Sequence, residues 1–294
     1  MKTPIIAQVQ QEQGQGHVTR RGLFLKLEKT LGRPVVSYFT STNYPVNIED
    51  TDADIIESVL QGLNLSKGLG VLISSHGGYG ESAERIINVC RSASGTGEFW
   101  AIVPGKAKSA ATMICFGASK IYMGASSELG PIDPQLSIRE DGRLKRFSLC
   151  NLVESYDELF NKAVGEKGNL EPYIQQLSRY DSREIKEYRA AIALSEDIGV
   201  RCLANGMMKG ETPEAIKKKI EIFLSPKTKK SHGRPIYRDE AENCGLVIEK
   251  VGGQDKLSNL IYELYIRTDN LVSTSASKCV ESTGHSFTAV RREK

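Results

Sequence analysis

GKAKSAATMIC (residues 105–115) is the stretch around which the rest of the chain is organised. It follows the apolar run FWAIVPG (99–105) and continues into apolar residues, which predicts a strand, a tight turn and a helix that begins at Ser109. A serine at this place can expose its hydroxyl beside the open N–H groups of the first helical turn. LISSHGGYGESAERII (72–87) has the same order of strand, turn and helix. The pair of turns suggests a site for acyl transfer.

The alternation of strands and helices predicts an α/β fold with a mainly parallel sheet flanked by helices. Apolar runs without alternation are typical of strands that are buried on both faces. Strands are expected at 35–39, 68–75, 99–105 and 120–124. Helical spacing of apolar residues is found at 18–31, 51–63, 83–90, 147–164, 182–208, 212–224 and 254–269. The loop SSELGPIDPQLS is expected to be stiff and non-helical, and the chain after it mostly helical.

Composition is that of an ordinary globular protein of 294 residues with a net charge of +3, which gives no case for nucleic acid as a partner. Six scattered cysteines are expected to be free thiols. The sequence contains no signal for secretion, no transmembrane segment and no metal or nucleotide motif, so we expect a cytoplasmic protein without a cofactor.

Nucleophilic catalysis by serine requires an exposed hydroxyl, an oxyanion hole and a base. Ser109 is the candidate nucleophile. Gly77 and Gly78 carry no side chains that block a substrate carbonyl, so their N–H groups and that of Ala110 are candidate oxyanion donors. Each feature also has a structural explanation, because serine is a common N-cap and Gly-Gly is common in tight turns.

Three motifs together are more specific than any of them alone: SSHGG (74–78), KSAAT (108–112) and LGPIDPQL (129–136). In this order they resemble the serine dehydrogenase proteinase family, a relative of signal peptide peptidase A within the Clp protease and crotonase superfamily. The resemblance covers about residues 18 to 250. It differs at His76, where the family usually has proline, and at Ala110-Ala111, where it usually has Gly-Gly.

This resemblance implies a Clp protease/crotonase-like fold with repeated ββα units and a helical C-terminal part. It implies a serine peptidase that acts on peptides or proteins and assembles into a homo-oligomer. Ser109 is then the nucleophile, Gly77, Gly78 and Ala110 form the oxyanion hole, and the loop with Gly130 and Pro131 is a wall of the site.

The base is open, because relatives use either a lysine or a histidine. Lys145 is favoured by its distance from Ser109 along the chain and its place before a helix. Lys162, His76 and His232 are alternatives. Asp133 either orients a base or serves turn chemistry.

Domain boundaries follow from the same observations. We expect a polar N-terminal arm at 1–17, the peptidase domain at 18–250, a C-terminal helix at 251–269 and a flexible tail at 270–294, which is rich in serine and threonine. Two other functions are compatible with the sequence. One is a catalytically degenerate oligomeric scaffold that binds partners, and the other is a crotonase-like enzyme acting on acyl-coenzyme A.

Overall fold

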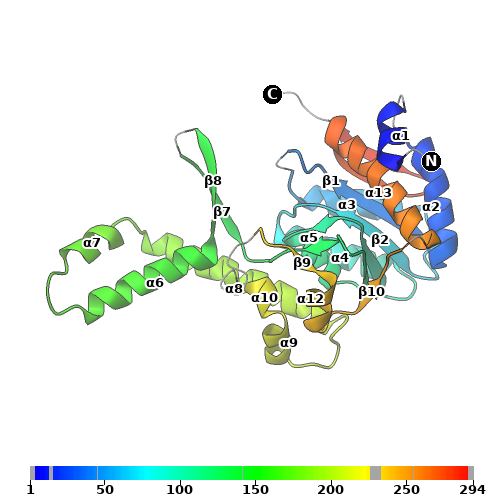
Figure 1. Cartoon of the computed structure of the whole chain (residues 1–294). Helices are drawn as coiled ribbons and strands as arrows, with labels where there is room; N and C mark the ends of the chain where they lie inside the picture. Colours follow the sequence, from blue (N-terminus) through cyan, green and yellow to red (C-terminus); the bar gives the residue numbers. More distant parts are fainter. Residues whose placement is uncertain are drawn as a thin grey trace.

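A seven-stranded sheet forms the centre of the computed structural model, which describes residues 4–12, 16–44, 46–140, 142–225, 233–253 and 255–290 (Figure 1). The strand order is β10-β5-β3-β2-β1-β11-β12. The five strands from β10 to β1 run parallel. At one edge, β11 pairs antiparallel with β1, and β12 pairs antiparallel with β11. The strands are β1 (Val35–Thr40), β2 (Leu69–Ser74), β3 (Phe99–Val103), β5 (Lys120–Met123), β10 (Ile248–Lys250), β11 (Ala276–Glu281) and β12 (Ser286–Val290). The predicted mixed α/β class with a mainly parallel sheet is confirmed.

Both faces of this sheet are covered by helices, which explains the unbroken apolar runs. Alternate side chains of β2 point to opposite faces, so that Val71 and Ile73 join one core and Leu72 joins the other. One face is covered by α3 (Asp50–Gln61), α4 (Gly80–Ala93), α5 (Ala110–Phe116) and the last part of α8 (Ser182–Ala204). The other face is covered by α2 (Val18–Leu31) and α13 (Lys256–Thr274).

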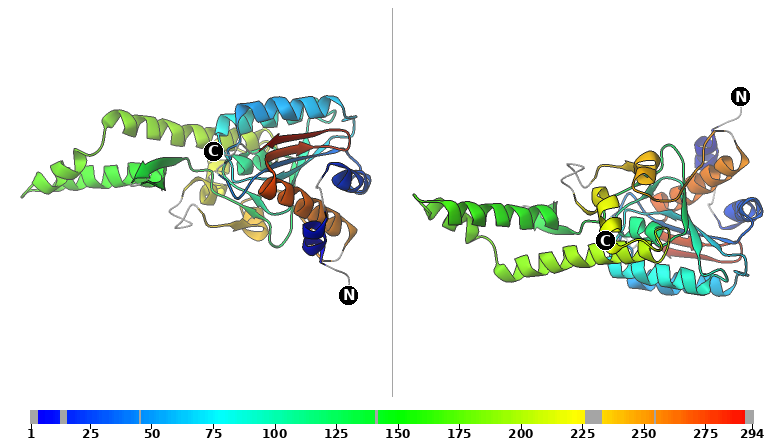
Figure 2. Two further views of the ribbon diagram at one scale, coloured as in Figure 1. Left: turned by 90° about the horizontal axis from the view of Figure 1, so that it is seen from above. Right: turned by 90° about the horizontal axis from the view of Figure 1, so that it is seen from below.

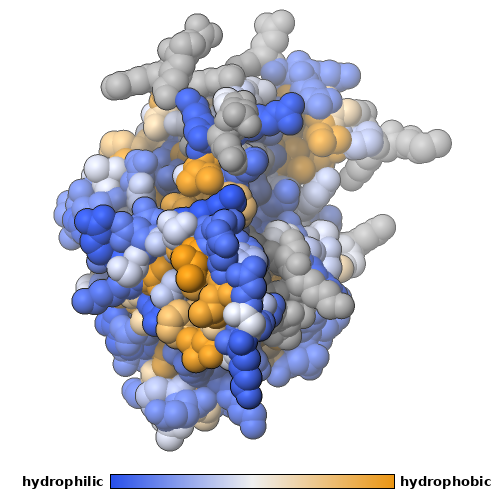
Figure 3. Space-filling model, turned by 90° about the vertical axis from the view of Figure 1, so that its left-hand side faces the viewer, coloured by the Kyte–Doolittle hydropathy of each residue, from blue (hydrophilic) through white to orange (hydrophobic). Residues whose placement is uncertain are grey.

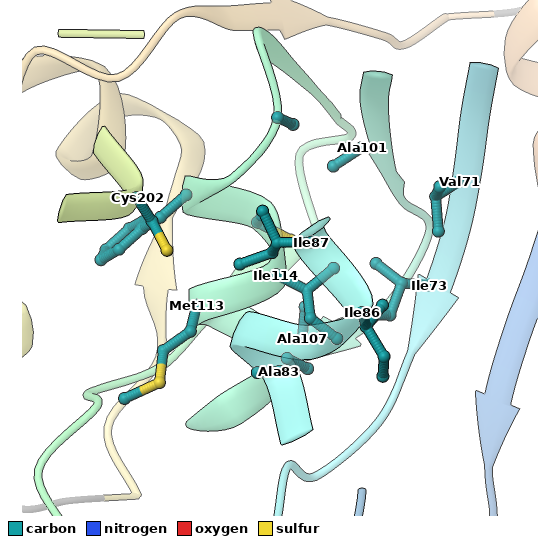
Figure 4. Packing of buried hydrophobic residues seen from close by; sticks show 14 of the residues in the cluster. Val71, Ile73, Ala83, Ile86, Ile87, Ala101, Ala107, Met113, Ile114 and Cys202 are labelled. Carbon is teal, nitrogen blue, oxygen red and sulfur yellow. The ribbon is translucent and has the colours of Figure 1, made fainter. Parts of the chain in front are cut away.

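The core on the first face holds the candidate serine's helix in place. In Figure 4, Ile86 and Ile87 of α4 lie against Ile114 of α5, with Ile73 of β2 behind them. Every residue of α5 is buried. The helix that follows Ser109 is therefore fixed by packing along its whole length.

A second, three-stranded sheet crosses the carboxyl ends of the parallel strands. It consists of β4 (Lys106–Ala107), β6 (Glu128–Leu129) and β9 (Ile236–Tyr237), and Ser75 extends it through a parallel bridge to Ala107. The chain thus passes from a long strand to a short strand and then to a helix, at β3, β4 and α5. This is one ββα unit of the kind that the resemblance implies.

An arm projects from this body in all views (Figures 1 and 2). It comprises the hairpin of β7 (Gln135–Glu140) and β8 (Arg143–Ser148), the helices α6 (Leu149–Gly165) and α7 (Glu171–Leu177), and the first part of α8. Apolar side chains are exposed along it at Ile138, Phe147, Phe160, Val164, Leu170 and Ile174. Figure 3, viewed from the side of the arm, shows apolar residues gathered in the middle of that face. The remaining elements are α9 (Pro213–Lys219), α10 (Glu221–Leu224) and α12 (Arg238–Asn243).

Both ends of the chain differ from the expectations. The N-terminal arm contains a helix, α1 (Ile5–Gln11), after which Glu12 pairs with Arg267 of α13 at 2.5 Å. The expected flexible tail at 270–294 instead completes α13 and forms β11 and β12 as far as Val290. Glu281 of β11 forms a buried two-bond ion pair with Arg20 of α2, both bonds being 2.6 Å long. The C-terminal segment is therefore part of the main sheet, and the expectation of a separate helix followed by a loose tail was wrong to that extent.

No helix in the described ranges is long and apolar enough to cross a membrane.

Candidate active site

Ser109 has an unusual backbone. Its φ and ψ angles are 50° and −121°, and it is the only residue other than glycine with a positive φ in the described part of the chain. The side chain makes no capping hydrogen bond to α5, whereas Asp181, Thr212 and Asp255 do cap their helices. The position is thus strained without the usual benefit of an N-cap, as is common for residues held for function.

The glycine turn after β2 lies directly against Ser109. A Cβ atom on Gly77, whose φ is +102°, would lie 2.7 Å from Ser109 Cβ and 2.6 Å from the Lys108 carbonyl oxygen. A Cβ atom on Gly78 would lie 2.2 Å from the Ile48 nitrogen. Only glycine fits at either position, so the two turns that the sequence analysis paired are indeed in contact.

The backbone N–H groups around Ser109 differ in their availability. Gly77 donates to Ser75 Oγ at 3.0 Å, and its carbonyl accepts from Ile48 at 2.9 Å. Because the peptide bond is trans, the N–H of Gly78 points away from Ile48. Neither Gly78 nor Ala110 donates its N–H to an acceptor in the described chain. These two N–H groups are therefore open, while that of Gly77 is engaged.

Sequence reasoning missed the side chains that hold these turns together. Thr40 donates to Ser75 Oγ at 2.8 Å, which fixes the acceptor of the Gly77 N–H. Thr112 lies 2.7 Å from the Ala107 carbonyl, and its hydroxyl accepts from Gly130 N–H at 3.1 Å. Thr112 belongs to the motif KSAAT, but nothing in its spacing indicates a partner 18 residues away.

The loop predicted as a wall adjoins the serine turn. Gly130 is packed so closely that a Cβ atom there would lie 2.6 Å from Lys108 Cδ. Pro131 is buried next to it. Asp133 is 2% exposed and lies with Ser195 around a small cavity against α8, and Ser109 does not line this cavity.

Cations surround His76. Partial burial lowers the pKa of its imidazole, and the nearby Lys106, Lys108 and Arg146 lower it further, against an opposing effect of Glu128. The Lys108 amine already donates to Glu128 Oε2 and to the Leu129 carbonyl, both at 3.0 Å. Burial lowers the pKa of Lys108 despite this carboxylate. The pKa of the imidazole is thus lowered, whereas the Lys108 amine is engaged by Glu128 and Leu129 of β6.

The other candidate bases lie in different places. Lys145 is exposed on β8, opposite Ile138 of β7. Lys162 lies on α6 in the arm, where it lines a pocket of about 310 Å³ with Glu158 and Arg179. His232 lies outside the described residues.

No group of three His, Cys, Asp or Glu residues in the described chain is arranged to hold a metal ion. Ser109 thus has a hydroxyl that makes no hydrogen bond in the described chain, with two open N–H groups nearby. These are the groups that a serine nucleophile and its oxyanion hole require.

The fold and this arrangement define a mixed α/β protein with a candidate nucleophilic serine at the carboxyl edge of a parallel sheet. No protein-family model matches the sequence, and none of the curated proteins compared with it matches either. Among solved structures, the chain is similar to that of a ClpP1 mutant from Listeria monocytogenes, with 15% sequence identity and a TM-score of 0.38. The similarity covers 78% of this chain and 98% of that chain. At this level it identifies neither the family nor the activity.

Proposed function

We propose that this chain is a serine peptidase in which Ser109 is the nucleophile. The observation that carries the proposal is the strained backbone of Ser109, combined with a hydroxyl that does not cap its helix. A cost of about 1–3 kcal/mol at one residue is retained where the geometry serves a function. The resemblance to the serine dehydrogenase proteinases and signal peptide peptidase A supports peptide bonds as the target.

The proposed reaction proceeds in two steps. Ser109 Oγ attacks the peptide carbonyl while a base takes its proton, and the N–H groups of Gly78 and Ala110 stabilise the oxyanion. The protonated base then gives its proton to the leaving amine, and water hydrolyses the serine ester by the same route. Gly77, which the sequence analysis grouped with the donors, has the role of a spacer that lets the two turns touch.

For the base, we propose Lys145 with His76 as the alternative. What supports Lys145 is its spacing from Ser109 and its place before a helix. Arg146 beside it is close enough to His76 to affect the pKa of the imidazole, but adjacent residues of a strand point to opposite faces, so this proximity applies to Arg146 and not to Lys145. His76 is adjacent to the turn, and the pKa of its imidazole is lowered. The two bases predict different pH profiles for acylation of Ser109. A histidine base loses activity as the pH falls below its lowered pKa, whereas a lysine base gains activity towards alkaline pH because it must first lose a proton.

Two wider features belong to the same proposal. All six cysteines are unpaired and five of them are buried, which supports a reducing compartment such as the cytoplasm. The exposed apolar side chains of the arm support assembly into a homo-oligomer.

Hydrolysis of a set of fluorogenic peptides tests the proposal. We expect cleavage by the wild type, none by Ser109→Ala, and full cleavage by the matched control Ser126→Ala, whose serine is exposed in the loop before β6. A folded wild type that cleaves none of the peptides and is inert to active-site reagents would favour the non-enzymatic scaffold.

A further inference from the structure

The outward face of the small sheet forms a charged surface beside Ser109. Ser75 and Ala107 are paired and both 0% exposed, so the residues next to them along the chain project from the opposite face. These are His76 on one side and Lys106 and Lys108 on the other. Glu128 is paired with Lys106 across β4 and β6, and it shares the same face.

Positive charge predominates on this surface. Glu128 is bound to Lys108 by the 3.0 Å ion pair, which compensates one of the cations. Arg146 approaches from the hairpin, close enough to influence His76. In the described chain, neither Lys106 nor Arg146 has a carboxylate within ion-pair distance.

Groups from the remaining neighbouring element, α13, form no ion pair with Lys106 or Arg146 among the described residues. Asp269 of α13 is near Lys106, but burial raises the pKa of its carboxyl. Tyr265, also on α13, lies against Gly105, where a Cβ atom would be 2.8 Å from its hydroxyl oxygen. Lys106 and Arg146 are thus two cations without an ion-pair partner in the described chain, and both lie close to His76 at the serine turn.

We propose that this surface binds a carboxylate of the substrate, so that the enzyme prefers peptides with an acidic group next to the scissile bond. Lys106 and Arg146 are the specificity-determining residues, and neither takes part in the chemical steps. The inference rests on the proposed function, since Ser109 defines which bond is adjacent. The carboxylate comes either from an Asp or Glu side chain or from a free C-terminus.

The experiment uses matched fluorogenic peptides that differ only in Asp against Asn flanking the scissile bond, each with a free and an amidated C-terminus. We expect a higher kcat/KM for the acidic member. This preference should fall when the salt concentration is raised from about 0.05 to 1 M, because at 1 M charges are screened beyond about 3 Å. Arg146→Gln should reduce the preference roughly two- to fivefold, the range for one exposed ion pair. The Asp and Asn pair tests recognition of a side-chain carboxylate, and the free and amidated pair tests recognition of the C-terminal carboxylate.

Arg143→Gln is the matched control, because it removes the same charge from the same strand, but from a side chain on the other face of β8. It should leave the preference unchanged. Equal cleavage of Asp and Asn peptides, or an equal effect of both variants, overturns the inference while leaving the peptidase intact.

Binding of the same peptides to Ser109→Ala, followed by fluorescence anisotropy, gives a second readout without catalysis. Preferential binding of acidic peptides that is lost in the double variant with Arg146→Gln supports the carboxylate surface even if no peptide is cleaved. Binding without regard to charge refutes it. Reaction of Ser109 with a fluorophosphonate tests the proposed function separately.

Discussion

Replacing Ser109 by glycine should make the protein more stable while removing its activity. At φ 50° and ψ −121° a Cβ atom costs about 1–3 kcal/mol, and glycine avoids this cost. Glycine also loses more chain entropy on folding, about 0.4–1 kcal/mol. As the serine hydroxyl caps nothing, no hydrogen bond to the helix is lost. The net gain is about 0.5–2 kcal/mol, or a rise in Tm of about 1–4 °C for a chain of this size.

The comparison that isolates this strain is Ser109→Gly against Ser109→Ala. Both variants lack the hydroxyl, but alanine keeps the Cβ atom and should melt at the wild-type temperature. The assay is thermal unfolding by circular dichroism, with urea unfolding as a check on the free energy. If glycine is no more stable than alanine, Ser109 is not strained, and the main support for its catalytic role is lost.

Three further predictions concern the surroundings of the serine and the C-terminal strand. Gly77→Ala should destabilise the fold by about 2 kcal/mol or more and abolish reaction of Ser109 with a fluorophosphonate, whereas Gly97→Ala, at a positive φ with open space around it, should keep the reaction. Glu281→Gln should cost about 3 kcal/mol in urea unfolding because it leaves Arg20 buried without its counter-charge, and a stability near that of the wild type would contradict the packing of β11. Because the pKa of His76 is lowered on folding, the stability that its neutral form allows is present above about pH 6.5 and is lost as the pH falls through the folded pKa. His76→Asn should therefore lose less stability in acid than the wild type. If the free energy of unfolding falls equally in both proteins as the pH is lowered, the pKa of His76 is not lowered.

The parallel strands and the two glycine- and serine-containing turns were predictable because local patterns specify them. Val71 to Ile73 are apolar without interruption, and only a strand covered on both faces needs this. The contact between Gly77 and Ser109 follows from topology, since the ends of adjacent parallel strands lie at one edge.

The C-terminal strand was not predictable in the same way. Ala276–Glu281 is polar at several positions, and its burial depends on Arg20, which is 261 residues away in the chain. Likewise, no strand was expected at the β7–β8 hairpin, whose two strands carry several charged residues and pair only with each other. Interactions between distant segments leave no local signal, and the identity of the base depends on one of them.

The most direct test is to react the intact chain with a fluorophosphonate and to locate the adduct by peptide mass mapping. We expect a single adduct on Ser109 that is absent after heat unfolding and absent in Ser109→Ala. A folded protein that carries no adduct, or carries it on another residue, contradicts the claim that Ser109 is the nucleophile.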